Sequence, residues 1–131
     1  MTMVVTPIGK TVLLVEDDSW LRYIMAELLA DDGYEVREAA TGTQALALVD
    51  EETPDVVVLD LNLPELSGLD VLHELRSRKP LLNLPVIVMS GALDGEIRQR
   101  LSRPSERADD VLEKPVDVGR LFECLEQAIV G

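Results

Sequence analysis

Apolar runs of strand length alternate with stretches of helical period along this chain, and this alternation restricts the fold more than any other feature. Strands are predicted at 11–15, 35–39, 56–59, 86–89 and 111–112, each followed by a helical stretch. Strands that alternate with helices favour parallel pairing. The pattern therefore predicts an α/β protein, a doubly wound sheet of five parallel strands with five helices in three α/β/α layers. Ser19 is positioned to cap the first helix.

The length of 131 residues suits one domain, and a hydrophobic fraction of 47% is enough for one core without disulfides or metal staples. Residues 1–9 are predicted to be a flexible N-terminal segment, and 10–131 the folded domain. No apolar run approaches the roughly 20 residues that cross a bilayer, and no secretory signal is visible. We therefore expect a cytoplasmic protein without a membrane span.

Charge and rare residues exclude several classes of function. Aspartate and glutamate number 25 against 12 lysines and arginines, and the net charge of -13 would repel a nucleic-acid backbone. The single cysteine, Cys124, excludes a disulfide framework or a multi-cysteine zinc site, and we expect it to be a small apolar residue on the last helix. The single histidine, His73, leaves no histidine-based triad to propose.

Polar side chains gather where the predicted strands end. They are Glu16, Asp17 and Asp18 after the first strand, Asp60 after the third, Ser90 after the fourth and Lys114 after the fifth. The carboxyl ends of parallel strands meet at one edge of the sheet, where ligand sites form. Clustered carboxylates repel one another unless a cation lies between them, and hard oxygen ligands suit Mg²⁺. Because Mg²⁺ usually also binds a phosphate oxygen, the pattern indicates a phosphoryl-dependent metal site.

Four motifs, in this order and spacing, resemble the receiver domain of bacterial two-component response regulators. They are VLLVEDD (12–18), VVVLDLNLPELSGLDVL (56–72), VIVMSG (86–91) and ADDVLEKP (108–115). The resemblance runs from about Lys10 to Ile129. It implies a flavodoxin-like receiver fold and a phosphoprotein of phosphorelay signal transduction. Such a domain is not an enzyme in the usual sense, because it catalyses only its own phosphorylation and dephosphorylation.

The resemblance also implies a role for each residue at the predicted edge. Asp60 would be the phosphoacceptor, Ser90 the hydroxyl that turns toward the phosphoryl group, and Lys114 the cation that pairs with it. The Lys114–Pro115 bond is cis in this family.

The Mg²⁺ site implied by the resemblance combines side chains and backbone. Asp17 and Asp60 would bind the ion directly, together with the backbone carbonyl of Asn62, and Glu16 would hold it through water. Asp18 would be peripheral.

The phosphodonor implied by the resemblance is a phosphohistidine on a sensor histidine kinase or a histidine phosphotransfer protein. Its helix would dock near Trp20 and Leu21, of which we expect one to pack in the core. A phosphorylation-linked homodimer is also compatible with the resemblance. The sequence leaves open whether the domain stands alone or belongs to a larger regulator.

The sequence departs from the family pattern near its C-terminal end. Val111 stands where the family usually has an aromatic residue, Arg107 where it usually has glycine, and Pro104 interrupts the preceding helical stretch. A valine has no ring to swing inward, so we expect the relay to the fourth and fifth helices to be weak and the output face to be atypical.

Three other functions compete with a phosphorylated receiver. A phosphorylation-independent interaction module of the same fold is favoured by Val111 and disfavoured by the intact acidic residues. A haloacid-dehalogenase-like phosphatase needs DxDxT at its first strand, where this chain has EDDSW. An FMN binder needs a Ser/Thr/Gly-rich loop there, and the three acids would repel its phosphate.

Overall fold

The five predicted strands form a single parallel sheet in the computed structural model, which describes residues 8–130. The strands are β1 (Thr11–Val15), β2 (Glu35–Ala39), β3 (Val56–Asp60), β4 (Val86–Ser90) and β5 (Asp110–Glu113). Their order in the sheet is β2-β1-β3-β4-β5, with every pairing parallel. Of the predicted flexible segment 1–9, residues 1–7 lie outside the described part, and Ile8 and Gly9 form a turn before β1.

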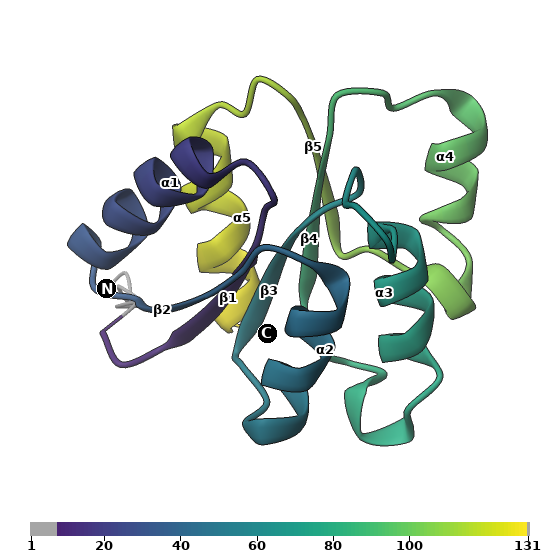
Figure 1. The fold of residues 1–131 in the computed structure, drawn as a ribbon, viewed down its shortest axis with the longest axis horizontal. Helices are drawn as coiled ribbons and strands as arrows, with labels where there is room; N and C mark the ends of the chain where they lie inside the picture. The colour runs from purple at the N-terminus through teal and green to yellow at the C-terminus, as the bar shows by residue number, and fades with distance from the viewer. Residues whose placement is uncertain (1–7, 131) are drawn as a thin grey trace, which may run out of the picture.

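Five α-helices cover the two faces of the sheet (Figure 1). Helices α1 (Ser19–Asp31) and α5 (Val118–Val130) lie on one face, and α2 (Gly42–Glu51), α3 (Gly68–Arg76) and α4 (Gly95–Arg100) lie on the other. Two 3-10 turns, Lys79–Leu81 and Pro104–Glu106, follow α3 and α4. The predicted three-layer α/β/α architecture is confirmed. No helix within residues 8–130 has the length and apolar character needed to span a membrane.

The core consists of two apolar layers that share the central strands. Leu13, Val57 and Leu59 face α2 and α3, whereas Val12, Val56 and Val58 face α1 and α5. Because β3 lies at the centre of the sheet, all five of its residues are buried, including Asp60 at its end. A strand buried on both faces must be apolar throughout. An aspartate there is an exception that packing does not explain.

The first helix begins one residue earlier than predicted. Its cap is Asp18, not Ser19, because the Asp18 carboxylate accepts hydrogen bonds from the backbone N–H groups of Trp20 and Leu21, each at 3.0 Å. Aspartate and serine are comparable N-caps, so the sequence alone did not distinguish them. Asp18 is therefore committed to the start of α1.

Gly68 brings the start of α3 against the end of β3. A Cβ at this position would lie 2.4 Å from the backbone oxygen of Asp60 and 2.5 Å from the Cα of Leu61. The N–H of Gly68 donates to the carbonyl of Leu61 at 3.0 Å, which closes the loop after β3. Only a residue without a side chain permits this approach. Gly68 thus helps to fix the backbone from which Asp60 projects.

Candidate functional site

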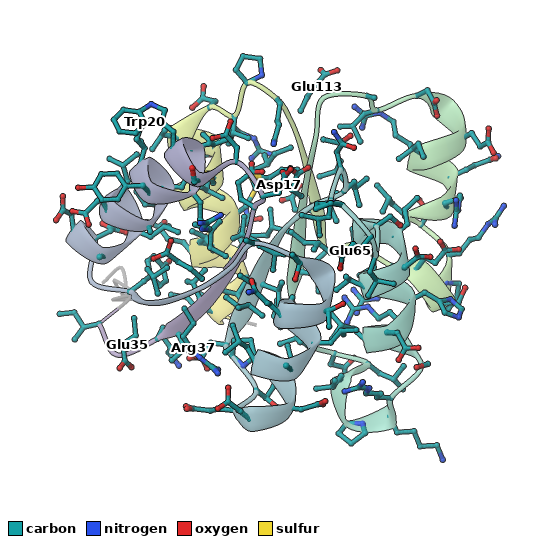
Figure 2. All side chains as sticks on the ribbon, viewed as in Figure 1. Asp17, Trp20, Glu35, Arg37, Glu65 and Glu113 are labelled. Carbon is teal, nitrogen blue, oxygen red and sulfur yellow. The ribbon has the colours of Figure 1, made fainter. Side chains whose placement is uncertain are left out.

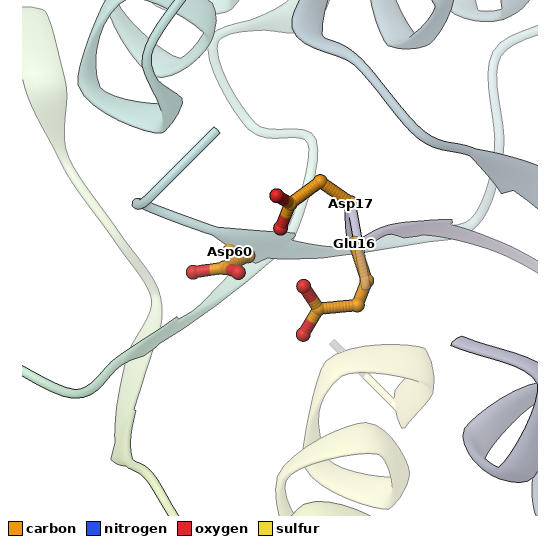
Figure 3. Close-up of side chains that lie close together, drawn as sticks. All are labelled: Glu16, Asp17 and Asp60. Atoms are coloured by element: carbon orange, nitrogen blue, oxygen red, sulfur yellow. The ribbon is translucent and has the colours of Figure 1, made fainter. Parts of the chain in front are cut away.

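Three carboxylates meet at the edge of the sheet where β1 and β3 end. Glu16 and Asp17 follow β1, and Asp60 is the last residue of β3. One carboxylate oxygen from each lies within 4.8 Å of the others, and the three side chains converge on one point (Figure 3). Glu16 and Asp60 are 0% and 2% exposed, whereas Asp17 is exposed. The cluster is therefore open to solvent on the side of Asp17.

Lys114 reaches this cluster from the end of β5. Its Nζ lies 2.7 Å from Oε1 of Glu16 and 2.9 Å from Oδ2 of Asp60. Burial lowers the pKa of Lys114, but the two ion pairs outweigh burial, so its pKa is raised and the ammonium stays charged. The Lys114–Pro115 bond is cis, as the resemblance implied. One cation thus bridges the two buried carboxylates.

The carboxyl group of Glu16 has a raised pKa. Burial first, and then the neighbouring Asp60 carboxylate, raise the pKa of Glu16 to about 7, against the opposing effect of Lys114. The one ammonium does not balance three carboxylates. A divalent cation would complete the neutralisation, and it would favour the ionised form of Glu16.

The donor set fits Mg²⁺. This ion prefers oxygen ligands, binds through one or two carboxylates and keeps several waters. The exposed carboxylate of Asp17 and the buried one of Asp60 meet that description. The backbone N–H of Asn62 donates to Oδ1 of Asp60 at 3.0 Å, so Asn62 lies at the site. The role of its carbonyl stays a prediction.

Ser90 ends β4, the strand next to β3, and is 5% exposed. Its hydroxyl oxygen accepts a hydrogen bond from the N–H of Ala92 at 3.1 Å. Its carbonyl accepts one from the N–H of Lys114 at 2.8 Å, so the two loops are joined. Ser90 and Asn62 both line a hollow of about 330 Å³ between the loops after β3 and β4.

Trp20 and Leu21 differ in their surroundings, as expected. Trp20 is 70% exposed and stacks on Tyr23, with ring centroids 6.1 Å apart, at the outer side of α1 (Figure 2). Leu21 is half-buried and packs against the core. It also lines an apolar cavity of about 230 Å³ between α1 and the segment that joins β5 to α5. Lys114 and Pro115 line the same cavity, which connects it to the acidic cluster.

The departures from the family pattern have defined places in the fold. Val111 is half-buried against the layer that contains α2 and α3. The Arg107 guanidinium donates to the Asp109 carboxylate at 2.6 Å and to the carbonyl of Leu82 at 2.8 Å. Pro104 begins the 3-10 turn after α4. Cys124 lies in the last helix, α5, as predicted, and the structure buries it, whereas His73 is exposed on α3.

Two arginines with defined contacts were not identified from the sequence, and of these Arg22 lies at the site, whereas Arg76 lies where β4 and β5 begin. Arg22 donates to the backbone carbonyl of Glu16 at 2.7 Å, and Arg76 is a buried cation that joins α3 to the start of β5. Arg22 itself lies outside the four motifs, and Arg76 bonds to Arg107 and Asp109, which are 31 and 33 residues away in sequence. An arginine one turn into a helix that follows an acidic loop is the only local signal for the first.

The sheet order and the acidic edge define a doubly wound α/β protein of the receiver class. Over residues 12–126 the sequence matches the response regulator receiver domain family, and the chain belongs to this family. Receiver domains are signalling domains of two-component systems, so the class inferred from the motifs is confirmed.

The relatives include single-domain and longer regulators. The chain is 32% identical over 120 residues to the chemotaxis protein CheY of Thermotoga maritima, covering 91% of this chain and 97% of that protein. It is 39% identical over 108 residues to the probable transcriptional regulatory protein TcrX of Mycobacterium tuberculosis, covering 82% of this chain and 44% of TcrX. It is 33% identical over 118 residues to NtrC of Salmonella typhimurium, covering 90% of this chain and 24% of NtrC. The chain thus spans less than half the length of TcrX and about a quarter of NtrC.

Solved structures support the same fold. The chemotaxis protein CheY4 of Vibrio cholerae matches with a TM-score of 0.84 at 28% identity, over 91% of this chain and 98% of that one. A response regulator from Chloroflexus aurantiacus matches with a TM-score of 0.82 at 27% identity, over 93% of this chain and 98% of that one.

Proposed function

We propose that this chain accepts a phosphoryl group on Asp60 from a phosphohistidine of a histidine kinase or phosphotransfer protein, with Mg²⁺, and that the modified state changes its contacts with partners. One observation carries the proposal. The carboxylate of Asp60 ends the central buried strand, 2.9 Å from the Lys114 ammonium and within the carboxylate trio. An ionisable group this buried is seldom retained for stability.

The transfer needs positioning and charge neutralisation more than covalent help. One Asp60 oxygen forms a bond to phosphorus, the phosphorus–nitrogen bond to the donor histidine breaks, and the imidazole nitrogen keeps the electron pair and takes up a proton. Mg²⁺, when bound, neutralises charge on the transferred group. Lys114 pairs with the phosphoryl oxygens, and Ser90 turns its hydroxyl from Ala92 toward them. The domain thereby catalyses only its own phosphorylation and dephosphorylation.

The phosphodonor docks near Trp20 and Leu21 in this proposal. The support is an exposed aromatic pair, Trp20 and Tyr23, beside an apolar cavity that Lys114 also lines. Aromatic anchors next to an apolar recess are typical of the energetic centre of an interface. A phosphohistidine on a helix seated there would lie close to Asp60.

The remaining features of the proposal follow from charge and family. The receiver domain comprises residues 10–131 and works in the cytoplasm. Its net charge of -13 argues against direct binding to nucleic acid. A phosphorylation-linked homodimer fits the same scheme.

A second candidate function, a phosphorylation-independent interaction module, is favoured by Val111, which removes the usual aromatic ring from β5.

The test is phosphorylation by a small-molecule donor. Incubation with phosphoramidate and Mg²⁺ should add the mass of one phosphoryl group, as measured by intact-protein mass spectrometry, and Asp60→Asn should abolish the gain. Asp18→Asn is the matched control, because asparagine caps the helix equally well and Asp18 is peripheral to the cluster. A mass gain that survives Asp60→Asn would refute the phosphoacceptor. No gain in the unaltered chain would favour the phosphorylation-independent module.

A further inference from the structure

Arg22 connects the first helix to the acidic loop. It lies about one turn into α1, with its side chain 20% exposed. Its Nη1 donates to the backbone carbonyl oxygen of Glu16 at 2.7 Å, and its Nε lies 3.3 Å from Oε1 of Glu38 in β2. The side chain therefore folds back over the start of its own helix and joins three segments of the chain.

The hydrogen bond acts on the peptide unit that leads into Asp17. A peptide group is planar, so the carbonyl of Glu16 and the N–H of Asp17 turn together. The N–H of Glu16 is held separately by the carbonyl of Ala39 at 3.0 Å. On the other side of Asp17, the carboxylate of Asp18 caps α1. Two peptide units lie between these anchors. The bond from Arg22 holds the first, and the N–H of Asp18, which donates to Oε2 of Glu16 at 3.4 Å, holds the second, so together they restrain the direction of the Asp17 side chain.

We propose that Arg22 is a positioning residue for the cation site, which it serves by orienting Asp17 toward Asp60. This inference rests on the Mg²⁺ site of the proposed function. Asp17 is the exposed member of the trio, with no buried surroundings of its own to hold it. It therefore depends on its backbone for direction more than Glu16 and Asp60 do. Removing a group that orients a metal ligand typically lowers metal affinity by about tenfold to a hundredfold.

The test compares Mg²⁺ affinity with stability in the full chain. Mg²⁺ is titrated while amide NMR signals of residues near Asp17 are followed, and thermal melts are recorded without metal. Arg22→Met keeps the apolar stem and loses both polar contacts. We expect its dissociation constant for Mg²⁺ to rise about tenfold or more. Glu38→Gln is the control, because it removes the partner of Nε and leaves the bond to Glu16 in place. Its affinity should stay within about twofold of the original.

Several results would overturn the inference. One is an Arg22→Met variant with a lower melting temperature but unchanged Mg²⁺ affinity, because the role would then be structural only. Another is an equal loss in Glu38→Gln, which would assign the effect to the ion pair. If Arg22→Met does not fold, Arg22→Gln replaces it, because its amide sits on a shorter stem that does not span the same distance to the Glu16 carbonyl, and unchanged affinity there refutes the role. A chain that binds no Mg²⁺ at all would instead refute the proposed metal site, and the inference with it.

Discussion

Glu16 shows, at the scale of a single residue, that the sheet edge is arranged for function at a cost in stability. Its carboxyl group is fully buried beside that of Asp60, and burial raises its pKa to about 7. Three carboxylates share one ammonium, so like charges remain close together. Relieving that repulsion should stabilise the metal-free protein. Removal of Asp17 or Asp60 is therefore expected to raise the metal-free melting temperature.

Mg²⁺ should stabilise the chain through Asp17. An ion at a hundred times its dissociation constant adds about 2.7 kcal/mol to the free energy of unfolding. We expect Asp17→Ala to abolish this gain in thermal melts with and without Mg²⁺, because it removes the exposed carboxylate of the trio. Asp18→Asn, which keeps the helix cap, should retain the gain. An equal Mg²⁺ shift in Asp17→Ala would locate the metal site elsewhere.

Cys124 should be unreactive in the folded chain. Burial first, and then its hydrogen bond to the Asp110 carboxylate at 2.9 Å, raise its pKa from 9.0 to about 12. The folded state thus keeps the thiol proton where the unfolded state loses it. The resulting stability is fully present below about pH 9 and is lost as the pH rises toward 12. Alkylation by iodoacetamide at pH 9, followed by mass spectrometry, should be slow in buffer and fast in urea.

Replacing Asp110, which accepts the hydrogen bond from the Cys124 thiol, provides a second test of this prediction. Asp110→Asn removes the charge that raises the pKa of the thiol, so labelling of the folded chain should become faster. Equal labelling rates with and without urea in the original chain would contradict the burial of Cys124.

At the scale of elements, the sequence predicts those parts of the fold that local patterns determine. The uninterrupted apolar run before Asp60 predicts a strand that is buried on both faces, and β3 is such a strand at the centre of the sheet. The six polar residues at the strand ends were expected at one edge, and the structure brings Glu16, Asp17, Asp60 and Lys114 into one cluster.

Contacts between distant segments were not predictable in the same way. Arg76 ends α3 and looks like an exposed polar residue, yet it is 4% exposed. Its partners are carbonyl oxygens at Leu81, Leu84 and Arg107 and the carboxylate of Asp109. No periodicity in the sequence indicates that these acceptors converge, because only the tertiary fold brings them together. The hydrogen bond from Arg22 to Glu16 was not predictable for a related reason, because it joins a side chain to a backbone carbonyl.

Arg76 should be the most costly of the arginines to replace. Arg76→Met leaves several buried acceptors and the Asp109 carboxylate without their donor, so we expect a loss of about 3–5 kcal/mol in the free energy of unfolding. Arg78→Met, two residues away, removes surface pairs with Asp50 and Glu74 and should cost about 1 kcal/mol or less. Urea unfolding monitored by circular dichroism measures both. Similar losses in the two variants would contradict the proposed importance of the buried network.

At the scale of the whole molecule, the candidate site lies at the edge of the sheet formed by the carboxyl ends of the strands, between the helices of the two faces. The face with α1 and α5 carries most of the exposed large apolar side chains, including Trp20 and Tyr23. On the other face, α4 spans six residues and contributes none to the buried core. A helix with little buried packing has few contacts through which a change at Ser90 could be transmitted. The architecture therefore favours a response that is strong near α1 and weak near α4.

Val111 provides the test of this asymmetry. A modification shifts an equilibrium only by its different interactions with the two states, and a half-buried valine has no ring to relocate between them. Beryllofluoride with Mg²⁺ stands in for the phosphoryl group on Asp60. We expect the resulting amide chemical-shift changes to be large in the loops that hold Asp60, Ser90 and Lys114, and small along α4, β5 and α5.

Asp60→Asn under the same conditions is the control, and it should show no such changes, because the carboxylate oxygen that binds beryllium is gone. Large changes along residues 117–129 would mean that α5 responds without an aromatic ring, which would contradict the expected weak relay. Changes confined to the site and α1 would instead mean that the modified state is recognised near Trp20, the proposed docking site of the phosphodonor. A receiver of that kind passes its phosphoryl group onward through the same surface that received it.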